Sequence, residues 1–237
     1  MPIVRPVAVR QVIHSFDELP DHPMAFTLGT FDGVHLGHQA IFSKLRSFGV
    51  PTCAITFKHH PLRLLRPNQA PLEITPLPLK LLLLKTDFCL LLDFTPELAS
   101  LTYEEFLNRL PISHLVLGKG SFLGREKKGT EPVLRAWGAA KGVHVDYIEK
   151  LPGISSTEIR HAIQRADFAA AETMLGRPHL LLAPSQTFSA EGLALPPDGS
   201  YPLYQNTALI KERTIHLAKP VAKPTILSFN PNKEFHV

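Results

Sequence analysis

The sequence concentrates residues suited to phosphate chemistry in one ten-residue segment, GTFDGVHLGH, at residues 29–38. The segment follows an apolar run, 25–30, that reads as a buried strand, and it leads into a predicted helix over 35–48. Its three glycines allow a close approach of the backbone to a ligand or a positive φ. The N-terminus of the helix offers unpaired N–H groups and a partial positive charge. His35 and His38, three residues apart, are expected to share one helix face and to donate hydrogen bonds to a phosphate under attack.

Two other interpretations of this segment compete with phosphate chemistry. A histidine in a helix is most often a surface or packed residue, and histidine pairs can also bind zinc. Zinc proteases, however, carry a glutamate between their two histidines, and no carboxylate lies between His35 and His38. Because the glycines, the strand end, the helix start and both histidines occur together, phosphate chemistry is favoured and no metal site is assigned.

A second segment, SSTEIR at 155–160, follows a predicted strand over 143–148. Its three hydroxyl residues precede a predicted helix over 157–165, where they can cap the helix or hold phosphate oxygens. Arg160 lies in the first turn and can make a forked contact with a phosphate. Alone, the segment would be an ordinary helix cap, but it occupies the same kind of strand-to-helix junction as the first segment.

Strand-like and helix-like segments alternate up to about residue 175. We predict strands at 25–30, 52–57, 88–94, 114–117 and 143–148, and helices at 35–48, 79–85, 103–110, 131–141, 157–165 and 168–175. This alternation predicts an α/β fold, a Rossmann-like doubly wound parallel sheet, whose ligands bind beyond the carboxyl ends of the strands. The remaining chain is rich in proline and short apolar runs such as 207–210 and 214–217, which predicts a small β-rich C-terminal module.

The composition and net charge indicate what kind of protein and ligand to expect. The chain has 237 residues, 44% apolar and 19% charged, with a net charge of +4 and a pI near 9.1. The positive charge could indicate nucleic acid, but the basic residues are scattered, and anionic small molecules explain the charge equally well; we expect no nucleic-acid partner. Cys53 and Cys89 lie in apolar runs and are expected to be buried thiols in a reducing compartment. The N-terminus does not read as a signal peptide and no run has the length of a membrane span, so we expect a cytoplasmic protein without a membrane partner.

Taken together, these segments resemble the bacterial FAD synthetase family, the adenylyltransferase module of bifunctional riboflavin kinase/FMN adenylyltransferases. The family patterns GxFDGVHxGH and SSTxIR are matched at 29–38 and 155–160. Thr56-Phe57 with His60-Pro61 is similar to TFxPHP, and 175–178 is similar to the LGRP at the end of the module. The resemblance implies a nucleotidyltransferase domain over 1–178 and a shortened, degenerate kinase-like module over 179–237.

The resemblance also implies a reaction and its residues. AMP passes from ATP, accompanied by Mg²⁺, to the phosphate of FMN, and FAD and pyrophosphate are the products. His35, His38 and Arg160 are the implied catalytic residues. The implied ATP-binding residues are Gly29, Thr30, Phe31, Asp32, Gly33, Gly37, Ser155, Ser156 and Thr157. The implied flavin-binding residues are Phe57, His60, Pro61, Gly118 and Lys119.

The sequence departs from the family on the flavin side and in the tail. Gly120 replaces an acidic residue of GxDFRFG, His59 replaces a proline and Lys58 stands where an acid is common. The tail lacks the kinase PTAN motif and has Thr214 in place of a catalytic glutamate, so riboflavin kinase activity is expected to be lost. Two alternatives stay open: AMP transfer to another phosphate acceptor, and a non-catalytic flavin- or nucleotide-binding regulator.

Overall fold

The computed structural model describes residues 11–233, and these form two compact units, each built from separate stretches of the chain. Unit 1 comprises residues 11–31, 37–71 and 81–151. Unit 2 comprises residues 32–36, 72–80 and 152–233. The GTFDGVHLGH segment therefore contributes to both units. The domain boundary predicted at residue 178 lies inside unit 2, because two helices that precede it belong to that unit.

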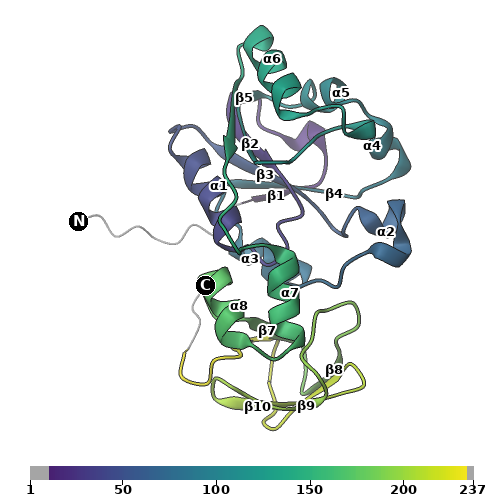
Figure 1. Ribbon diagram of the computed structural model, residues 1–237, viewed down its shortest axis with the longest axis vertical. Helices are drawn as coiled ribbons and strands as arrows, with labels where there is room; N and C mark the ends of the chain where they lie inside the picture. The colour runs from purple at the N-terminus through teal and green to yellow at the C-terminus, as the bar shows by residue number, and fades with distance from the viewer. Residues whose placement is uncertain (1–10, 234–237) are drawn as a thin grey trace, which may run out of the picture. The chain divides into compact units, whose positions relative to one another are not determined.

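Unit 1 is built on a six-stranded parallel sheet in the order β1-β4-β3-β2-β5-β6 (Figure 1). The strands are β1 (Gln11–Ile13), β2 (Met24–Leu28), β3 (Thr52–Phe57), β4 (Phe88–Leu92), β5 (Ile112–Gly118) and β6 (His144–Ile148). From β2 the chain adds β3 and β4 on one side and later adds β5 and β6 on the other. The carboxyl end of β2 therefore lies at the topological switch point, where sheets of this kind bind ligands. The predicted α/β class is confirmed.

The helices between these strands are α1 (Leu36–Arg46), α2 (Leu62–Leu65), α3 (Leu77–Leu83), α4 (Pro96–Ser100), α5 (Tyr103–Leu107) and α6 (Glu131–Lys141). Short 3₁₀ turns occupy Phe16–Glu18, Pro67–Gln69 and Arg125–Lys127. Helices α4, α5 and α6 lie on one side of the sheet (Figure 1), where Phe106, Leu134 and Trp137 belong to the same buried cluster as Phe26 and Ile55 of the strands.

Most predicted elements of unit 1 are present within two or three residues. The spans 52–57 and 131–141 agree at both ends, and the structure has the capping box of Thr102 and Glu105. The short elements β1, α2 and α4 were not predicted, because three to five residues carry too little periodicity to be recognised. Cys53 and Cys89 are buried thiols, as expected.

Unit 2 combines two helices with antiparallel strands. The helices are α7 (Ser156–Gln164) and α8 (Phe168–Leu175). One sheet has the order β8 (Thr187–Ser189), β11 (Thr214–Leu217), β10 (Asn206–Lys211), β9 (Gly199–Leu203), and a second pairs β12 (Thr225–Ser228) with β7 (Leu180–Ala183). Their core includes Leu181, Leu203, Ile210 and Ile215. The predicted β-rich character of the C-terminal region is confirmed.

Among residues 11–233, no helix combines the length and apolar character needed to cross a membrane.

Candidate functional site

Directly after β2, the first part of the GTFDGVHLGH segment is tied to the sheet of unit 1. The Gly29 N–H donates to the Ile55 carbonyl at 3.1 Å, and the Thr30 carbonyl accepts from Thr56 Oγ1 at 3.2 Å. A Cβ at Gly29 would lie 3.1 Å from the Phe31 ring, so a larger residue would displace that ring.

The buried Phe31 ring fixes His38, which lies in the first turn of α1. The two rings meet edge to face, with centroids 5.2 Å apart and an interplanar angle of 86°. Phe31 itself has a φ of 48°, a left-handed conformation that is uncommon for a residue with a side chain. This packing restricts the orientation of the His38 imidazole.

Inside unit 2, Asp32 is the centre of a buried hydrogen-bond network. Its Oδ1 accepts from the backbone N–H groups of Ile74 at 2.9 Å and Thr75 at 3.1 Å. Its Oδ2 pairs with Arg160 Nη2 at 3.1 Å, and Arg160 Nε donates to the Leu72 carbonyl at 2.7 Å. The ion pair is nearly shielded from solvent, so removal of either partner would leave a buried charge without its counterpart.

The two sequence motifs meet within unit 2. Ser156 Oγ donates to the backbone carbonyl of Asp32 at 2.9 Å. Ser155 is the N-cap of α7, and its side chain accepts from the Glu158 N–H at 3.2 Å. The hydroxyl of Ser156 and the guanidinium of Arg160 therefore hold the loop at 32–36 against the first turns of α7.

A second buried arginine, Arg177, also supports this loop, and the sequence does not predict its role. Arg177 Nη2 donates to the Gly33 carbonyl at 2.7 Å, and burial lowers the pKa of Arg177 to about 10. Gly33 has a φ of 83°, and a Cβ there would lie 3.2 Å from Ile74 Cδ1. In the sequence, Arg177 stands out only as part of the LGRP pattern, and nothing in its neighbours along the chain indicates a partner 144 residues away.

His35 is a buried imidazole in unit 2. Helix α1 begins at Leu36, one residue later than predicted, so His35 precedes the helix while His38 lies within it. Burial lowers the pKa of His35 to about 4. The side chain is therefore neutral at pH 7 and acts as a hydrogen-bonding group without a full positive charge.

The predicted flavin residues lie at or just beyond the carboxyl ends of strands of unit 1. Phe57 ends β3 and packs edge to face with Phe94 at 5.3 Å, and Pro61 immediately precedes α2. Gly118 ends β5, whereas Lys119 forms ion pairs with Glu131 at 3.4 Å and Glu149 at 3.3 Å. Its charge is therefore already balanced by two carboxylates.

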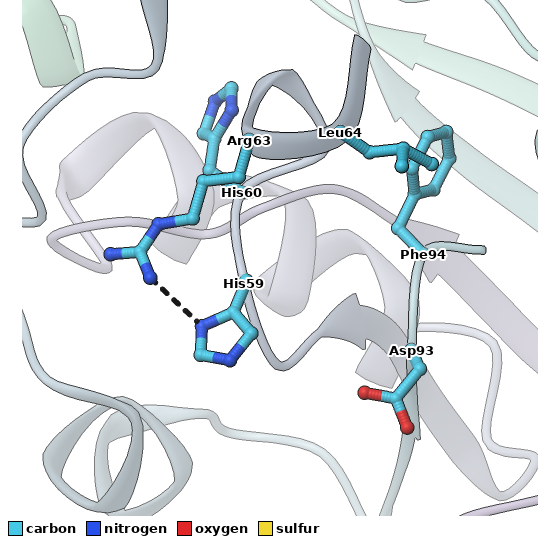
Figure 2. A pocket seen from close by; sticks show the side chains of 6 residues that line it. All are labelled: His59, His60, Arg63, Leu64, Asp93 and Phe94. Atoms are coloured by element: carbon cyan, nitrogen blue, oxygen red, sulfur yellow. Dashed lines mark hydrogen bonds between the residues drawn. The ribbon is translucent and has the colours of Figure 1, made fainter. Parts of the chain in front are cut away.

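A cavity of about 250 Å³ opens in unit 1 beyond β3 and β4 (Figure 2). Of the predicted flavin residues, only His60 lines it. The other lining residues are His59, Arg63, Leu64, Asp93 and Phe94. In the sequence, His59 stands out only as a departure from the family pattern, and no motif indicates a role for the remaining four.

Comparison with known proteins decides the family. The model described as FAD synthetase matches residues 17–162, more than half of the chain. The chain belongs to the FAD synthetase family. A bifunctional riboflavin kinase/FMN adenylyltransferase from Pseudomonas fluorescens is 36% identical over 174 residues, which cover 64% of this chain and 54% of the relative. The protein of the same name from Escherichia coli strain K12 is 31% identical over 182 residues, or 70% of this chain and 58% of the relative.

The aligned part of this FAD synthetase family member thus spans little more than half the length of these relatives. Among solved structures, a macrolide-efflux protein from Streptococcus pneumoniae has a similar fold. Its TM-score is 0.76, with 21% identity, over 92% of this chain and 89% of the other. At that identity the likeness concerns the fold alone.

Proposed function

We propose that the protein is an FMN adenylyltransferase. A phosphate oxygen of FMN attacks the α-phosphorus of ATP and forms a new P–O bond, while the bond from that phosphorus to the bridging oxygen breaks and pyrophosphate leaves. The observation that carries the proposal is the meeting of the two family motifs in unit 2, through Arg160 with Asp32 and Ser156 with the Asp32 carbonyl. A regulator that only bound flavin would not require both motifs in this arrangement.

The N-terminus of α7 is the proposed seat for the β- and γ-phosphates of ATP. Backbone N–H groups in the first turn of a nine-residue helix attract anions. Ser155, Ser156 and Thr157 form the start of this turn, but the Ser156 hydroxyl proton is already directed at Asp32. Two nitrogens of Arg160 already donate hydrogen bonds within the protein, to the Leu72 carbonyl and to Asp32. The main role of Arg160 is therefore to position the loop at 32–36.

His35 and His38 are proposed to donate hydrogen bonds to the α-phosphate as charge develops on it. His35, whose imidazole burial keeps neutral, can do this without reorganisation in the transition state. Gly29, Thr30, Phe31 and Gly37 keep the backbone close to the nucleotide.

Mg²⁺ is part of the proposed substrate, as Mg-ATP. Proteins commonly bind this ion through substrate phosphates and one or two carboxylates. Asp32 does not suit this role, because its carboxylate is taken up by Arg160 and two backbone N–H groups. In the part of the chain that the structure describes, no group of three or more His, Cys, Asp or Glu side chains is arranged to hold a metal ion. A cytoplasmic location, with ATP and FMN as substrates and neither nucleic acid nor a membrane as a partner, belongs to the same proposal.

We further propose that riboflavin kinase activity is lost. Thr214 stands on β11, opposite Lys211 on one side and Ser189 on the other, and its hydroxyl cannot serve as a carboxylate base. Two neighbouring acids are already engaged: Glu191 pairs with Arg213 at 3.3 Å, and Asp198 accepts from the Glu212 N–H at 3.1 Å.

The test is incubation of the purified protein with ATP and either FMN or riboflavin, with and without Mg²⁺, followed by chromatographic separation of the flavins. We expect FAD from FMN, one pyrophosphate per FAD, only with the divalent ion, and no FMN from riboflavin. Pantetheine phosphate and nicotinate mononucleotide serve as rival acceptors in parallel reactions. Folded protein that forms no FAD at saturating substrates would refute the proposed function, and FMN made from riboflavin would refute the loss of the kinase.

A further inference from the structure

The turn at 190–194, in the β-rich part of unit 2, is hydrogen-bonded to a segment that lies far earlier in the chain. The Gly192 carbonyl accepts from the Glu73 N–H at 2.8 Å, and the Ala194 N–H donates to the Glu73 carbonyl at 2.7 Å. Leu193 is thereby paired with Glu73 as in a parallel sheet. The turn therefore binds both backbone polar groups of Glu73 and determines where this residue lies.

The next two residues of that segment hold the Asp32 carboxylate. Ile74 and Thr75 donate their N–H groups to Asp32 Oδ1 at 2.9 and 3.1 Å. The Ile74 side chain also belongs to a buried cluster with Ala194 from the turn and Ile159 from α7. Because consecutive residues are joined through planar peptide bonds, a shift of the turn would move these N–H groups and the carboxylate that they bind.

Arg213 is the residue that holds the turn in place. It stands in the two-residue connection between β10 and β11, where Lys211 is paired with Thr214. Its Nη2 donates to the carbonyl of Ala190 at 3.2 Å and to the carbonyl of Leu193. Its own carbonyl accepts from the Ala190 N–H at 2.9 Å. One residue of the hairpin therefore makes three hydrogen bonds to the turn.

The backbone of this hairpin connection does not favour the residues that occupy it. Glu212 and Arg213 have φ of 47° and 61°, in the left-handed region where two-residue hairpins usually have asparagine and glycine. Such conformations persist where other contacts over-determine them, and they often mark a functional position. The contacts of Arg213 with the turn need a guanidinium, whose charge is balanced by Glu191 at 3.3 Å.

We propose that Arg213 is a positioning residue for adenylyl transfer. It holds the turn at 190–194, and the turn holds the segment at 73–75. That segment binds Asp32 and so determines the position of the loop at 32–36. The inference rests on the proposed function, because it concerns a loop assigned to ATP. It gives the C-terminal module a role in this reaction that requires no kinase activity.

The test compares Arg213→Met with Lys219→Met, in hydrogen exchange followed by mass spectrometry and in steady-state FAD synthesis. Methionine retains part of the apolar stem of arginine and removes its donors, which limits the loss of packing. Lys219 is the matched control, because it also donates to a backbone carbonyl of this module, that of Gln205 at 2.9 Å. Gln205 lies at the opposite end of β10 from Arg213, so the control leaves the turn intact.

In Arg213→Met, amides in peptides that cover 72–76 and 190–194 should exchange about tenfold faster. This is the low end for loss of a hydrogen bond from a charged group, and it applies because the Arg213 side chain is 35% exposed. Peptides that cover β3 in unit 1 should exchange at the wild-type rate. Lys219→Met should retain the wild-type rates at 72–76. These rates do not depend on any activity.

In FAD synthesis, Arg213→Met should lower kcat/KM for ATP about tenfold, mainly through a higher KM. Small misplacement of a binding group can cost up to roughly a hundredfold, and here the effect is transmitted through two segments. A purely structural role would instead reduce the amount of folded enzyme, which lowers the apparent kcat and leaves KM unchanged. Arg213→Lys, which retains the charge and one donor group, should show smaller changes in both measurements. It carries the same comparison should Arg213→Met not fold.

Wild-type exchange at 72–76 in the folded variant would overturn the inference, and so would an unchanged KM for ATP. If the wild-type protein forms no FAD, the proposed function is refuted, and the exchange rates still decide whether Arg213 holds the segment that binds Asp32.

Discussion

Replacement of His179 by phenylalanine should change how the stability of the protein depends on pH. His179 is buried in unit 2 among aromatic rings. It stacks on Phe229, with centroids 5.1 Å apart and planes 22° apart, and lies parallel to the more distant Phe168 at 6.3 Å. Burial, with a smaller contribution from the positive charge of Arg177, lowers the pKa of His179 from 6.5 to about 3. A phenylalanine has a similar shape and suits the same stack.

The magnitude follows from proton linkage. Below pH 6.5 the unfolded chain binds a proton at His179 that the native protein does not bind, so the free energy of unfolding falls as the pH falls. Between pH 8 and pH 5 this one residue should lower it by about 2 kcal/mol. The loss continues down to about pH 3, where the native histidine also becomes protonated. His35, with a pKa of about 4, should contribute a similar loss that both proteins share.

The assay is urea unfolding at pH 8 and pH 5, followed by circular dichroism. The midpoint of the wild-type protein should shift between the two pH values by about 1 M urea more than that of His179→Phe. The exposed His22 provides the control, since His22→Gln should retain the wild-type pH dependence. Trp137, the single tryptophan, lies in unit 1, so its fluorescence reports separately on that unit. An identical pH dependence in wild type and His179→Phe would refute the reasoning, whatever the absolute stability of the variant.

Three further predictions concern the loop at 32–36 and His38 in the first turn of α1. Gly33→Ala should lower the free energy of unfolding by about 1–3 kcal/mol in urea titrations, because of its positive φ and the 3.2 Å approach to Ile74. Gly49→Ala, with a positive φ but open space, should lower it less, and equal losses would contradict the packing argument. Arg160→Met and Asp32→Asn should each lower the free energy of unfolding by roughly 3 kcal/mol, because each leaves one buried charge without its partner. The double variant should lose less than the sum of the two single losses. Strictly additive losses would show that the two side chains are not energetically coupled. In steady-state FAD synthesis, His38→Ala should lower kcat about 100- to 1,000-fold with little change in KM for ATP. An unchanged kcat would mean that His38 contributes only to packing.

The sequence alone determined the fold class, the family resemblance and the position of both family motifs. The strand at 52–57 and the helices at 131–141 and 168–175 were predicted at both ends, because their apolar spacing and their glycine and proline boundaries are local signals. The motifs could be placed at strand-to-helix junctions for the same reason. Short elements such as β1 could not be predicted, since three residues form a strand only through the partner strand that they pair with.

Only the tertiary structure decided which residues act together. Arg160 is three residues beyond Thr157 in the sequence, yet its charge is used by Asp32, 128 residues away, and Arg177 holds a carbonyl 144 residues away. The cavity at Arg63 and Asp93 likewise arises because β3 and β4 are neighbours in the sheet. Periodicity and capping describe the chain over one or two turns. The burial of a charge and the partner that balances it depend on contacts between distant segments, and these exist only once the chain has folded.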